Sequence, residues 1–184
     1  MKTILLSIIC LAVLCSCGDS TLSQPESVQS KEYFPLHIGD TWKYAVVGMV
    51  WNDTLTATIK GTKTFNGKTY FEVSKSFVIR DVKPFVEYYR TENDKVYTYE
   101  NSSDNLFIDF VNKDTSVGYV YSLSDNIITK IGTFNNVKNV QWRASAVDGA
   151  PYNAYAPNIG LISSVIEGPS YELMYAKVGD KVYK

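Results

Sequence analysis

The sequence predicts a mainly β protein: one curved antiparallel sheet that forms an open or half β-barrel, with at most one short helix. Strand-forming residues are abundant, with 14 Tyr and 8 Phe among 184 residues and many Val, Ile and Thr, and they often alternate with polar residues. Turn-forming sequences separate these runs at regular intervals, which is typical of a meander. Several runs are apolar on both faces, so we expect a sheet that closes into a barrel or wraps a helix or a cavity.

Residues 1–16 are predicted to be a lipoprotein signal peptide that is removed from the mature protein. Lys2 precedes an apolar run that ends at Leu14, and this run is too short to cross a bilayer, because a spanning helix needs about 20 residues. Signal peptidases require small side chains next to the cleaved bond. Among the three cysteines only Cys17 follows a small residue, Ser16.

The end of this segment, Leu-Cys-Ser-Cys, resembles the lipobox of bacterial lipoproteins. The resemblance implies that Cys17 is acylated and becomes the first mature residue; a secretory signal cut nearby, which would leave a free thiol, is the alternative. Lipid attachment places the protein in the bacterial cell envelope. Gly18 stands where an aspartate resembles an inner-membrane retention signal in enterobacteria, so we expect the outer membrane, on its periplasmic or its surface face.

The mature chain is predicted to consist of a flexible tether, residues 17–32, and a single antiparallel β domain, residues 33–184. The tether is rich in Ser, Gln, Pro, Asp and Glu and has too few apolar residues to order itself. Because Cys17 is used for attachment, the domain has no thiol, and this excludes an intramolecular disulfide, a Cys nucleophile and a Cys-ligated zinc. Its stability must come from packing.

Residues 54–60 are the clearest strand, with Leu55, Ala57 and Ile59 on one face. This strand leads into Asn-Gly at 66–67, the strongest short hairpin signal, because a type I′ turn needs positive φ at both central residues. Further strands are predicted at 41–50, 69–79, 85–91, 95–100, 117–123, 127–132, 137–144, 159–166 and 171–178. Residues 104–112 fit a short helix capped by Asp104 and fit a strand equally well.

The sequence excludes several classes of chemistry. His37 is the single histidine, so a histidine metal cluster is impossible and we expect a packing or surface role for it. No Gly-x-Ser-x-Gly elbow, Gly-x-Gly-x-x-Gly run or P-loop occurs, and no cofactor is expected. With 18 basic and 19 acidic residues and no basic run, the chain is not expected to bind nucleic acid.

Two patterns leave other functions open. Glu87 together with Asp109 or Glu172 could serve a carboxylate-dependent hydrolase if the carboxyl groups converge in a cleft, and Asp109 would need a partner if it is buried in its apolar run. Strand tyrosines could form a sugar-stacking row, although packing of the rings is the simpler interpretation. The tyrosines concerned are Tyr88, Tyr89, Tyr97, Tyr99, Tyr119 and Tyr121.

Two segments resemble small Bacteroidota-type lipoproteins of unknown function. Residues 33–44, YFPLHIGDTWKY, match their YFPL-x-x-G-x-x-W-x-Y opening, and YAPNIGLI at 155–162 followed by YEL at 171–173 matches their APG-x-GLV … YEL closing segment. Asn158 stands in place of the more usual glycine, which asparagine can replace because it tolerates left-handed backbone. The resemblance implies a location and a fold but no activity. These residues are expected to start and close a sheet, with Trp42 and Tyr44 as anchors.

The sequence therefore predicts a membrane-anchored exported lipoprotein without enzymatic activity. We expect a binding or accessory protein for a hydrophobic ligand or a partner protein, held by a concave apolar face. An internal cavity larger than about 300 Å³ would favour this hypothesis, and a filled core would count against it. A glycan-binding module and, less favoured, the carboxylate-dependent hydrolase are the alternatives.

Overall fold

The computed structural model describes residues 32–116, 118–122, 126–142, 151–165 and 168–184. The predicted signal peptide and nearly all of the predicted tether lie outside these residues. Within these ranges the chain forms strands and no helix. No helix that is long and apolar enough to cross a membrane therefore occurs there. The strands are β1 (Thr41–Val47), β2 (Asn52–Phe65), β3 (Lys68–Phe77), β4 (Phe85–Glu92), β5 (Lys95–Glu100), β6 (Ser103–Asp109), β7 (Gly118–Ser122), β8 (Ile127–Thr129), β9 (Gly132–Phe134), β10 (Lys138–Trp142), β11 (Tyr152–Ala156), β12 (Gly160–Val165), β13 (Ser170–Val178) and β14 (Lys181–Tyr183).

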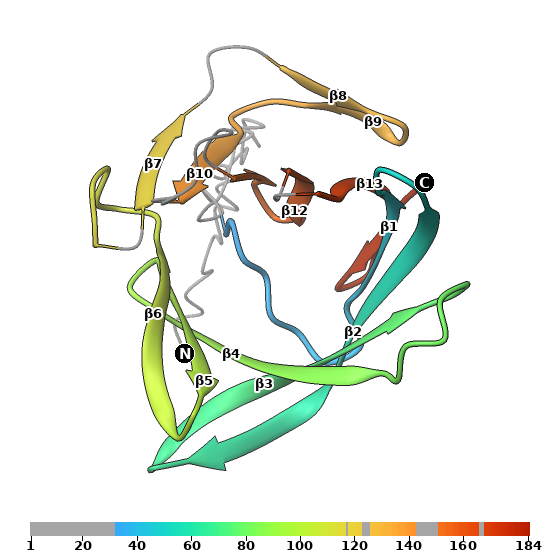
Figure 1. Ribbon diagram of the computed structural model, residues 1–184. Coiled ribbons are helices and arrows are strands. Elements are labelled where there is room, and N and C mark those ends of the chain that lie inside the picture. The colour runs from blue at the N-terminus through green and yellow to red at the C-terminus, as the bar shows by residue number, and fades with distance from the viewer. Residues whose placement is uncertain (1–31, 117, 123–125, 143–150, 166–167) are drawn as a thin grey trace, which may run out of the picture. The chain divides into compact units, whose positions relative to one another are not determined.

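One antiparallel sheet forms the body of the domain (Figure 1). Its strands follow the order β6-β5-β4-β3-β2-β1-β13-β12-β11-β10-β7, and β14 pairs with the free part of β13. The sheet curves until it is nearly closed into a barrel, but the end strands β6 and β7 do not pair, so a seam stays open. The predicted fold class, a curved antiparallel sheet in an open barrel, is confirmed.

The predicted hairpin at Asn66 and Gly67 joins β2 to β3. Both residues have positive φ, 50° and 75°, as a tight hairpin turn requires. Residues 54–60 alternate as expected, and Leu55, Ala57 and Ile59 face the interior of the barrel. Local pattern and local structure agree here because the two-residue turn fixes the register of the strands beside it, and the pairing shifts only farther along, between Ile59 and Gly61.

Residues 104–109 belong to a strand, β6, and the helical alternative is wrong. Pairing with β5 decides the outcome, because Val96 lies opposite Ile108 and both side chains are buried in the core. The strand ends where the carboxylate of Asp109 accepts hydrogen bonds from the backbone N–H groups of Val111 and Asn112, each at 3.0 Å.

Residues 127–132 do not form one strand but the start of a separate hairpin, β8–β9. Gly132 has a φ of 143°, and the Thr129 hydroxyl bonds the backbone of the turn, accepting from Ile131 N–H and donating to Gly132 C=O. The backbone N–H of Lys130 donates to the Glu172 carboxylate at 2.9 Å, which ties this hairpin to β13.

The opening and closing segments of the domain pack against each other. Trp42 Nε1 donates a 2.7 Å hydrogen bond to the carbonyl of Ile159, and the Tyr44 hydroxyl donates to the carbonyl of Leu161 at 3.2 Å. Asn158 has a φ of 61°, the left-handed backbone expected for a residue in the place of glycine. Trp42 and Tyr44 are therefore the anchors that the sequence predicts.

Asp40 closes the same end of the barrel. Its buried carboxylate accepts hydrogen bonds from Gly179 N–H at 2.7 Å and His37 N–H at 3.1 Å, and its second contact with His37 is to Nδ1 at 3.0 Å. Residues far apart in the sequence are thus joined at the turn before β1. His37 is exposed and binds Asp40, so its role is structural and at the surface, in agreement with the sequence prediction.

Candidate functional site

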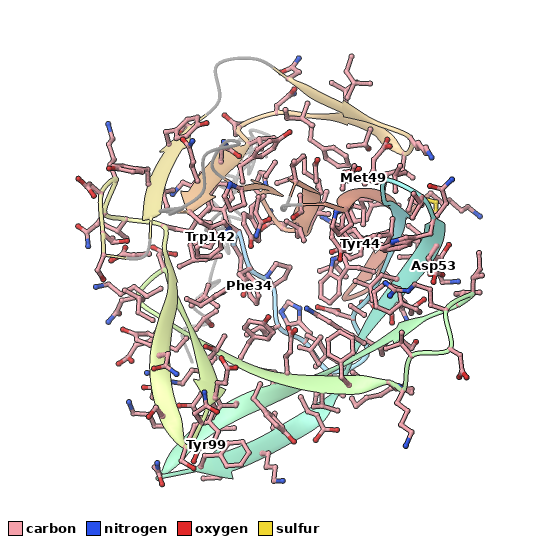
Figure 2. All side chains as sticks on the ribbon, viewed as in Figure 1. Phe34, Tyr44, Met49, Asp53, Tyr99 and Trp142 are labelled. Carbon is pink, nitrogen blue, oxygen red and sulfur yellow. The ribbon has the colours of Figure 1, made fainter. Side chains whose placement is uncertain are left out.

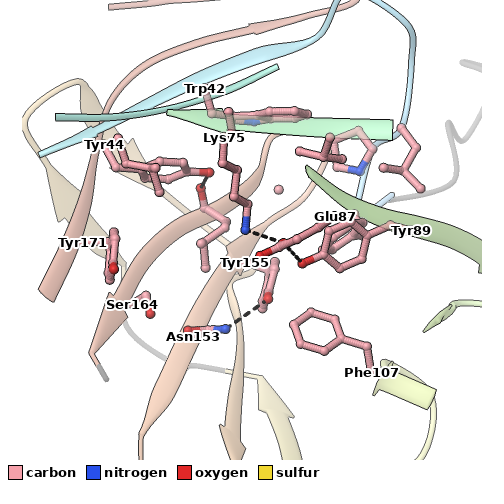
Figure 3. Close-up of a pocket in the computed structure, with 18 of the residues that line it drawn as sticks. Trp42, Tyr44, Lys75, Glu87, Tyr89, Phe107, Asn153, Tyr155, Ser164 and Tyr171 are labelled. Carbon is pink, nitrogen blue, oxygen red and sulfur yellow. Dashed lines mark hydrogen bonds and ion pairs between the residues drawn. The ribbon is translucent and has the colours of Figure 1, made fainter. Parts of the chain in front are cut away.

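A cavity of about 380 Å³ lies on the concave side of the sheet (Figure 3). Its lining comes from β1 to β4, from β6, from β11 to β13 and from the segment that precedes β1. Aromatic rings dominate the lining, among them Phe34, Trp42, Tyr44, Tyr89 and Tyr155. The volume exceeds the threshold that the hypothesis of a hydrophobic ligand required, and it lies in the range of small-molecule sites.

Strand alternation explains how the sequence builds this cavity. Successive residues of a strand point to opposite faces, so Trp42, Tyr44 and Val46 of β1 face the interior together. Small residues at other inward positions, including Ala57 and Ser164, leave space between the large rings. The cavity is therefore a consequence of which residue sizes stand at inward positions.

The segment before β1 forms the floor of the cavity. The ring of Phe34 packs 5.2 Å from that of Tyr89 and 6.1 Å from that of Tyr155, and Leu36 is buried. Pro35 contacts Gly160, where an added Cβ would lie 3.3 Å from the proline Cδ. At the other end of the cavity Phe85 is 38% exposed. Because Pro35 and Leu36 are buried and Phe85 is the most exposed of the lining residues, we infer that the cavity is closed at the floor and opens toward Phe85.

Lys75 and Glu87 bring two opposite charges into the lining. Lys75 Nζ lies 2.5 Å from Glu87 Oε2, and the Tyr89 hydroxyl donates a short hydrogen bond to the same oxygen (Figure 3). Burial and the neighbouring Glu87 raise the pKa of Tyr89 well above its ordinary value, so this phenol stays neutral. The two charges compensate each other, and the site favours a ligand whose buried part is uncharged.

Asn153 supplies an unpaired hydrogen-bond acceptor. Its side chain lines the cavity and is 9% exposed; Nδ2 donates to the Tyr155 hydroxyl at 3.2 Å, while Oδ1 has no partner among the described residues. A buried acceptor without a partner costs about 1–3 kcal/mol. Burial raises the pKa of Tyr155 far above its ordinary value, so its hydroxyl keeps its proton. Asn153 Oδ1 is therefore a buried acceptor at the edge of the cavity that lacks a hydrogen-bond donor among the described residues.

The structure does not bring the three candidate carboxylates together. Glu87 is the one carboxylate among the described lining residues. Glu172 lies between the inward-facing Tyr171 and Leu173, so it points to the outer face of the sheet, where it binds the β8–β9 hairpin. Asp109 is absent from the lining.

Asp109 has the partners that its burial requires. Its carboxylate accepts from Asn112 Nδ2 at 2.6 Å and lies 3.1 Å from Lys95 Nζ, in addition to its two backbone donors. Desolvation raises the pKa of Asp109, but the backbone and amide donors of Asn112 and Val111 and the ammonium of Lys95 outweigh it and lower the pKa to about 2. Asp109 is therefore a structural group that is ionised at neutral pH.

The candidate tyrosines lie in different environments. Tyr89 faces the cavity, and Tyr99 stacks on Phe65 with ring centroids 4.1 Å apart. Tyr97 lies 3.9 Å from the guanidinium of Arg90. Tyr88 packs against Phe65 as well, at 4.9 Å, whereas Tyr119 and Tyr121 of β7 are the more exposed pair. These residues do not form the single row that the glycan-binding alternative requires.

Among the described residues no group of three or more His, Cys, Asp or Glu side chains could hold a metal ion. The predicted lipid-attachment residue, Cys17, lies outside the described residues. The site that the structure describes is therefore the apolar cavity with its charge pair and its unpaired amide.

Two solved bacterial structures resemble this chain in fold. One is a candidate lipoprotein from Parabacteroides distasonis, with 13% identity and a TM-score of 0.48, matching 80% of this chain and 99% of that protein. The other is a candidate exported protein with a YmcC-like fold from Bacteroides fragilis, with 12% identity and a TM-score of 0.48, matching 84% of this chain and 100% of that protein. No family model and no curated protein matches the sequence.

Sequence reasoning named Glu87 but missed Lys75 and Asn153. The sequence did contain a pattern that indicates Lys75: Val73 and Phe77, two residues before and after it, lie on the same inward face of its strand. Glu87 likewise lies between two aromatic residues of the same face on the next strand. A charge at an apolar position on each of two paired strands indicates an internal ion pair. No comparable signal marked Asn153, because residues 152–156 were not predicted as a strand.

Proposed function

We propose that this protein is an exported lipoprotein, anchored through Cys17 to the outer membrane, that binds an apolar ligand in its barrel without transforming it. The observation that carries the proposal is the cavity of about 380 Å³ lined chiefly by aromatic and aliphatic side chains. Soluble cores are normally packed without voids of this size, so an apolar space of this kind favours occupation by a ligand.

The polar groups of the lining narrow the class of ligand. Lys75 and Glu87 neutralise each other, which disfavours a ligand with a single buried charge. Asn153 Oδ1 needs a donor, and a hydroxyl or amide N–H group supplies one. The ligand best suited to the site is an apolar chain or ring system with one uncharged hydrogen-bond donor, such as a monoacylglycerol, rather than a free fatty acid.

The same groups support a binding role over catalysis. Glu87 Oε2 already accepts from Tyr89 and pairs with Lys75, and no second carboxylate stands among the described lining residues to form an acid–base pair with it. The remaining described polar lining groups are tyrosine hydroxyls, an amide and the Ser164 hydroxyl. Among these groups the Tyr89 hydroxyl donates to the Glu87 carboxylate, but burial and the charge of Glu87 raise the pKa of this phenol well above its ordinary value, so it is not activated as a nucleophile.

A cavity-filling substitution tests the proposal. Ala57→Phe places a ring in the cavity, and Thr56→Phe on the outer side of the same strand is the matched control. We expect Ala57→Phe to weaken binding of an environment-sensitive apolar fluorophore, and its displacement by monoacylglycerol, at least tenfold, while Thr56→Phe binds as the unchanged protein does. Thermal unfolding of both variants verifies that they fold. Equal binding by folded Ala57→Phe and control would overturn the proposal.

A further inference from the structure

Two neighbouring turns at the open end of the barrel carry strongly exposed apolar side chains. In the β1–β2 turn Met49 is 91% and Val50 93% exposed; in the β3–β4 loop Val78 is 68% and Ile79 74% exposed. We call these four residues the apolar rim. Isolated exposed apolar residues are ordinary, but four on adjoining turns form a patch of the kind that marks an interaction surface.

The two turns are held together and are ordered by their hydrogen bonds. Asp53, at the start of β2, accepts from the backbone N–H groups of Val78, Ile79 and Arg80 at 3.1, 2.9 and 2.9 Å. The guanidinium of Arg80 lies 4.3 Å from the ring centre of Trp51. Figure 2 shows Met49 at the β1–β2 turn with Asp53 on the strand beside it. The backbone N–H groups of Val78 and Ile79 therefore have partners, the other turn is closed by the hydrogen bond from Gly48 N–H to the Trp51 carbonyl at 2.8 Å, and Asp53 ties the two turns together.

The apolar rim borders the open end of the cavity. Phe77, which lines the cavity, is followed directly in the chain by Val78 and Ile79. Phe85, the exposed lining residue, begins the next strand after the same loop. The floor at Phe34 belongs to the opposite end of the barrel. A surface that covers the rim therefore also covers the mouth of the cavity.

The composition of the two turns fits a lipid bilayer. Aliphatic tips protrude, Trp51 lies half-buried behind them, and the exposed Arg80 and Lys83 flank them with one acidic neighbour, Asp81. Tryptophan and arginine are the residues that occupy the headgroup level of membranes, and cations there attract anionic lipids. Protein interfaces of standard size instead need about 800 Å² per partner with a core of well-packed aromatic side chains.

The predicted tether is long enough for the apolar rim to reach the membrane in which Cys17 would be anchored. Glu32 is bound at the closed end of the barrel, where its N–H donates to Asn158 Oδ1 at 3.1 Å. The 15 peptide units from Cys17 to Glu32 can reach at most about 50 Å. A strand of seven residues, such as β1, spans about 23 Å. A lipid attached at Cys17 therefore does not prevent the opposite end of the barrel from reaching the same membrane.

We propose that the apolar rim inserts into the headgroup region of a lipid bilayer, so that the cavity mouth faces the membrane and receives its ligand from it. The insertion itself depends only on the rim; the delivery of ligand rests on the function proposed above. The rim then acts as a docking surface, and the cavity behind it as the receiving site.

Depth-sensitive fluorescence of the mature acylated protein in anionic vesicles tests the insertion. Met49→Cys provides the position for an NBD label in the rim, and Asp180→Cys, in the exposed β13–β14 turn at the closed end, is the control. We expect lipids with a shallow doxyl group to quench the label at 49 at least threefold more strongly than the label at 180. Equal quenching, with both labels in an aqueous environment, would overturn the inference.

A second measurement separates this inference from the proposed function. Ile79→Asp and Val78→Asp should slow transfer of an apolar fluorophore from vesicles at least tenfold and leave its binding from detergent-free solution unchanged. If the label at 49 lies in lipid but the protein binds no fluorophore, insertion of the apolar rim is supported and the ligand-binding function is contradicted. If the protein binds the fluorophore but the label at 49 stays in water, insertion of the apolar rim is contradicted and the proposed ligand-binding function is unaffected.

Discussion

Replacement of Asn153 by leucine should stabilise the empty protein and weaken its binding of ligand. The side chains are similar in volume, and the substitution removes the buried carbonyl that lacks a partner, whose burial costs about 1–3 kcal/mol. It also removes the hydrogen bond from Nδ2 to the Tyr155 hydroxyl, worth about 1 kcal/mol. The expected net gain is about 1 kcal/mol in the free energy of unfolding, or a rise in Tm of about 2–4 °C.

Asn139→Leu is the matched control for this experiment. Asn139 is also buried, also has an unpaired Oδ1 and also donates from Nδ2 to a tyrosine, Tyr121, but it does not line the cavity. Urea unfolding should show similar gains for both variants. Titration with monoacylglycerol should show affinity reduced roughly twofold to tenfold for Asn153→Leu alone, the value of one hydrogen bond. Unchanged affinity in Asn153→Leu, or a clear loss of stability there but not in Asn139→Leu, would refute the assignment of Asn153 as a ligand acceptor.

The predicted lipid anchor, a buried carboxylate and a buried indole can each be tested by one substitution. Cys17→Ser should abolish incorporation of labelled palmitate and release the protein from membranes; a labelled variant would mean that another residue is acylated. Because the pKa of Asp109 is about 2 when folded against 3.8 ordinarily, this group contributes about 2 kcal/mol of stability above pH 4 that is lost as the pH falls to 2. Asp53 and Asp104 also have lowered pKa values, so urea unfolding at each pH should show a loss for Asp109→Asn that is smaller by this amount and not absent. Trp42→Phe leaves the carbonyl of Ile159 without its donor and should lower the free energy of unfolding by about 1–3 kcal/mol, whereas an unchanged value would show that water replaces the indole.

The parts of the fold that depend on neighbouring residues could be predicted from the sequence. The hairpin at 66–67 and the alternation of β2 follow from local preferences for turn and strand. Strand β11, residues 152–156, was missed because Asn153 and Ala154 have low strand propensity, and its pairing with β10 and β12 overrides that preference. The pairing of β1 with β13 joins residues more than a hundred positions apart, and no periodicity reports such a contact.

The candidate site could be predicted only in outline. Apolar residues on both faces of several strands indicated a covered concave surface, and the cavity confirms that part. Which polar groups enter it depends on register: Lys75 and Glu87 meet because their strands pair with Lys75 opposite Phe85 and Val73 opposite Glu87. A shift of one residue in this pairing would leave one of the two charges inside and turn the other to the outer face.

The two motifs that resemble other lipoproteins hold the closed end of the barrel together and supply many of the apolar residues that line the cavity. Pro35 packs on Gly160, and Trp42 donates to Ile159, so the opening and closing segments hold the floor of the cavity in place. The groups proposed to select the ligand, among them Asn153, lie outside both motifs. In this chain the motif residues therefore set the floor and many of the apolar rings of the cavity, while Lys75, Glu87 and Asn153 set the polarity of its lining.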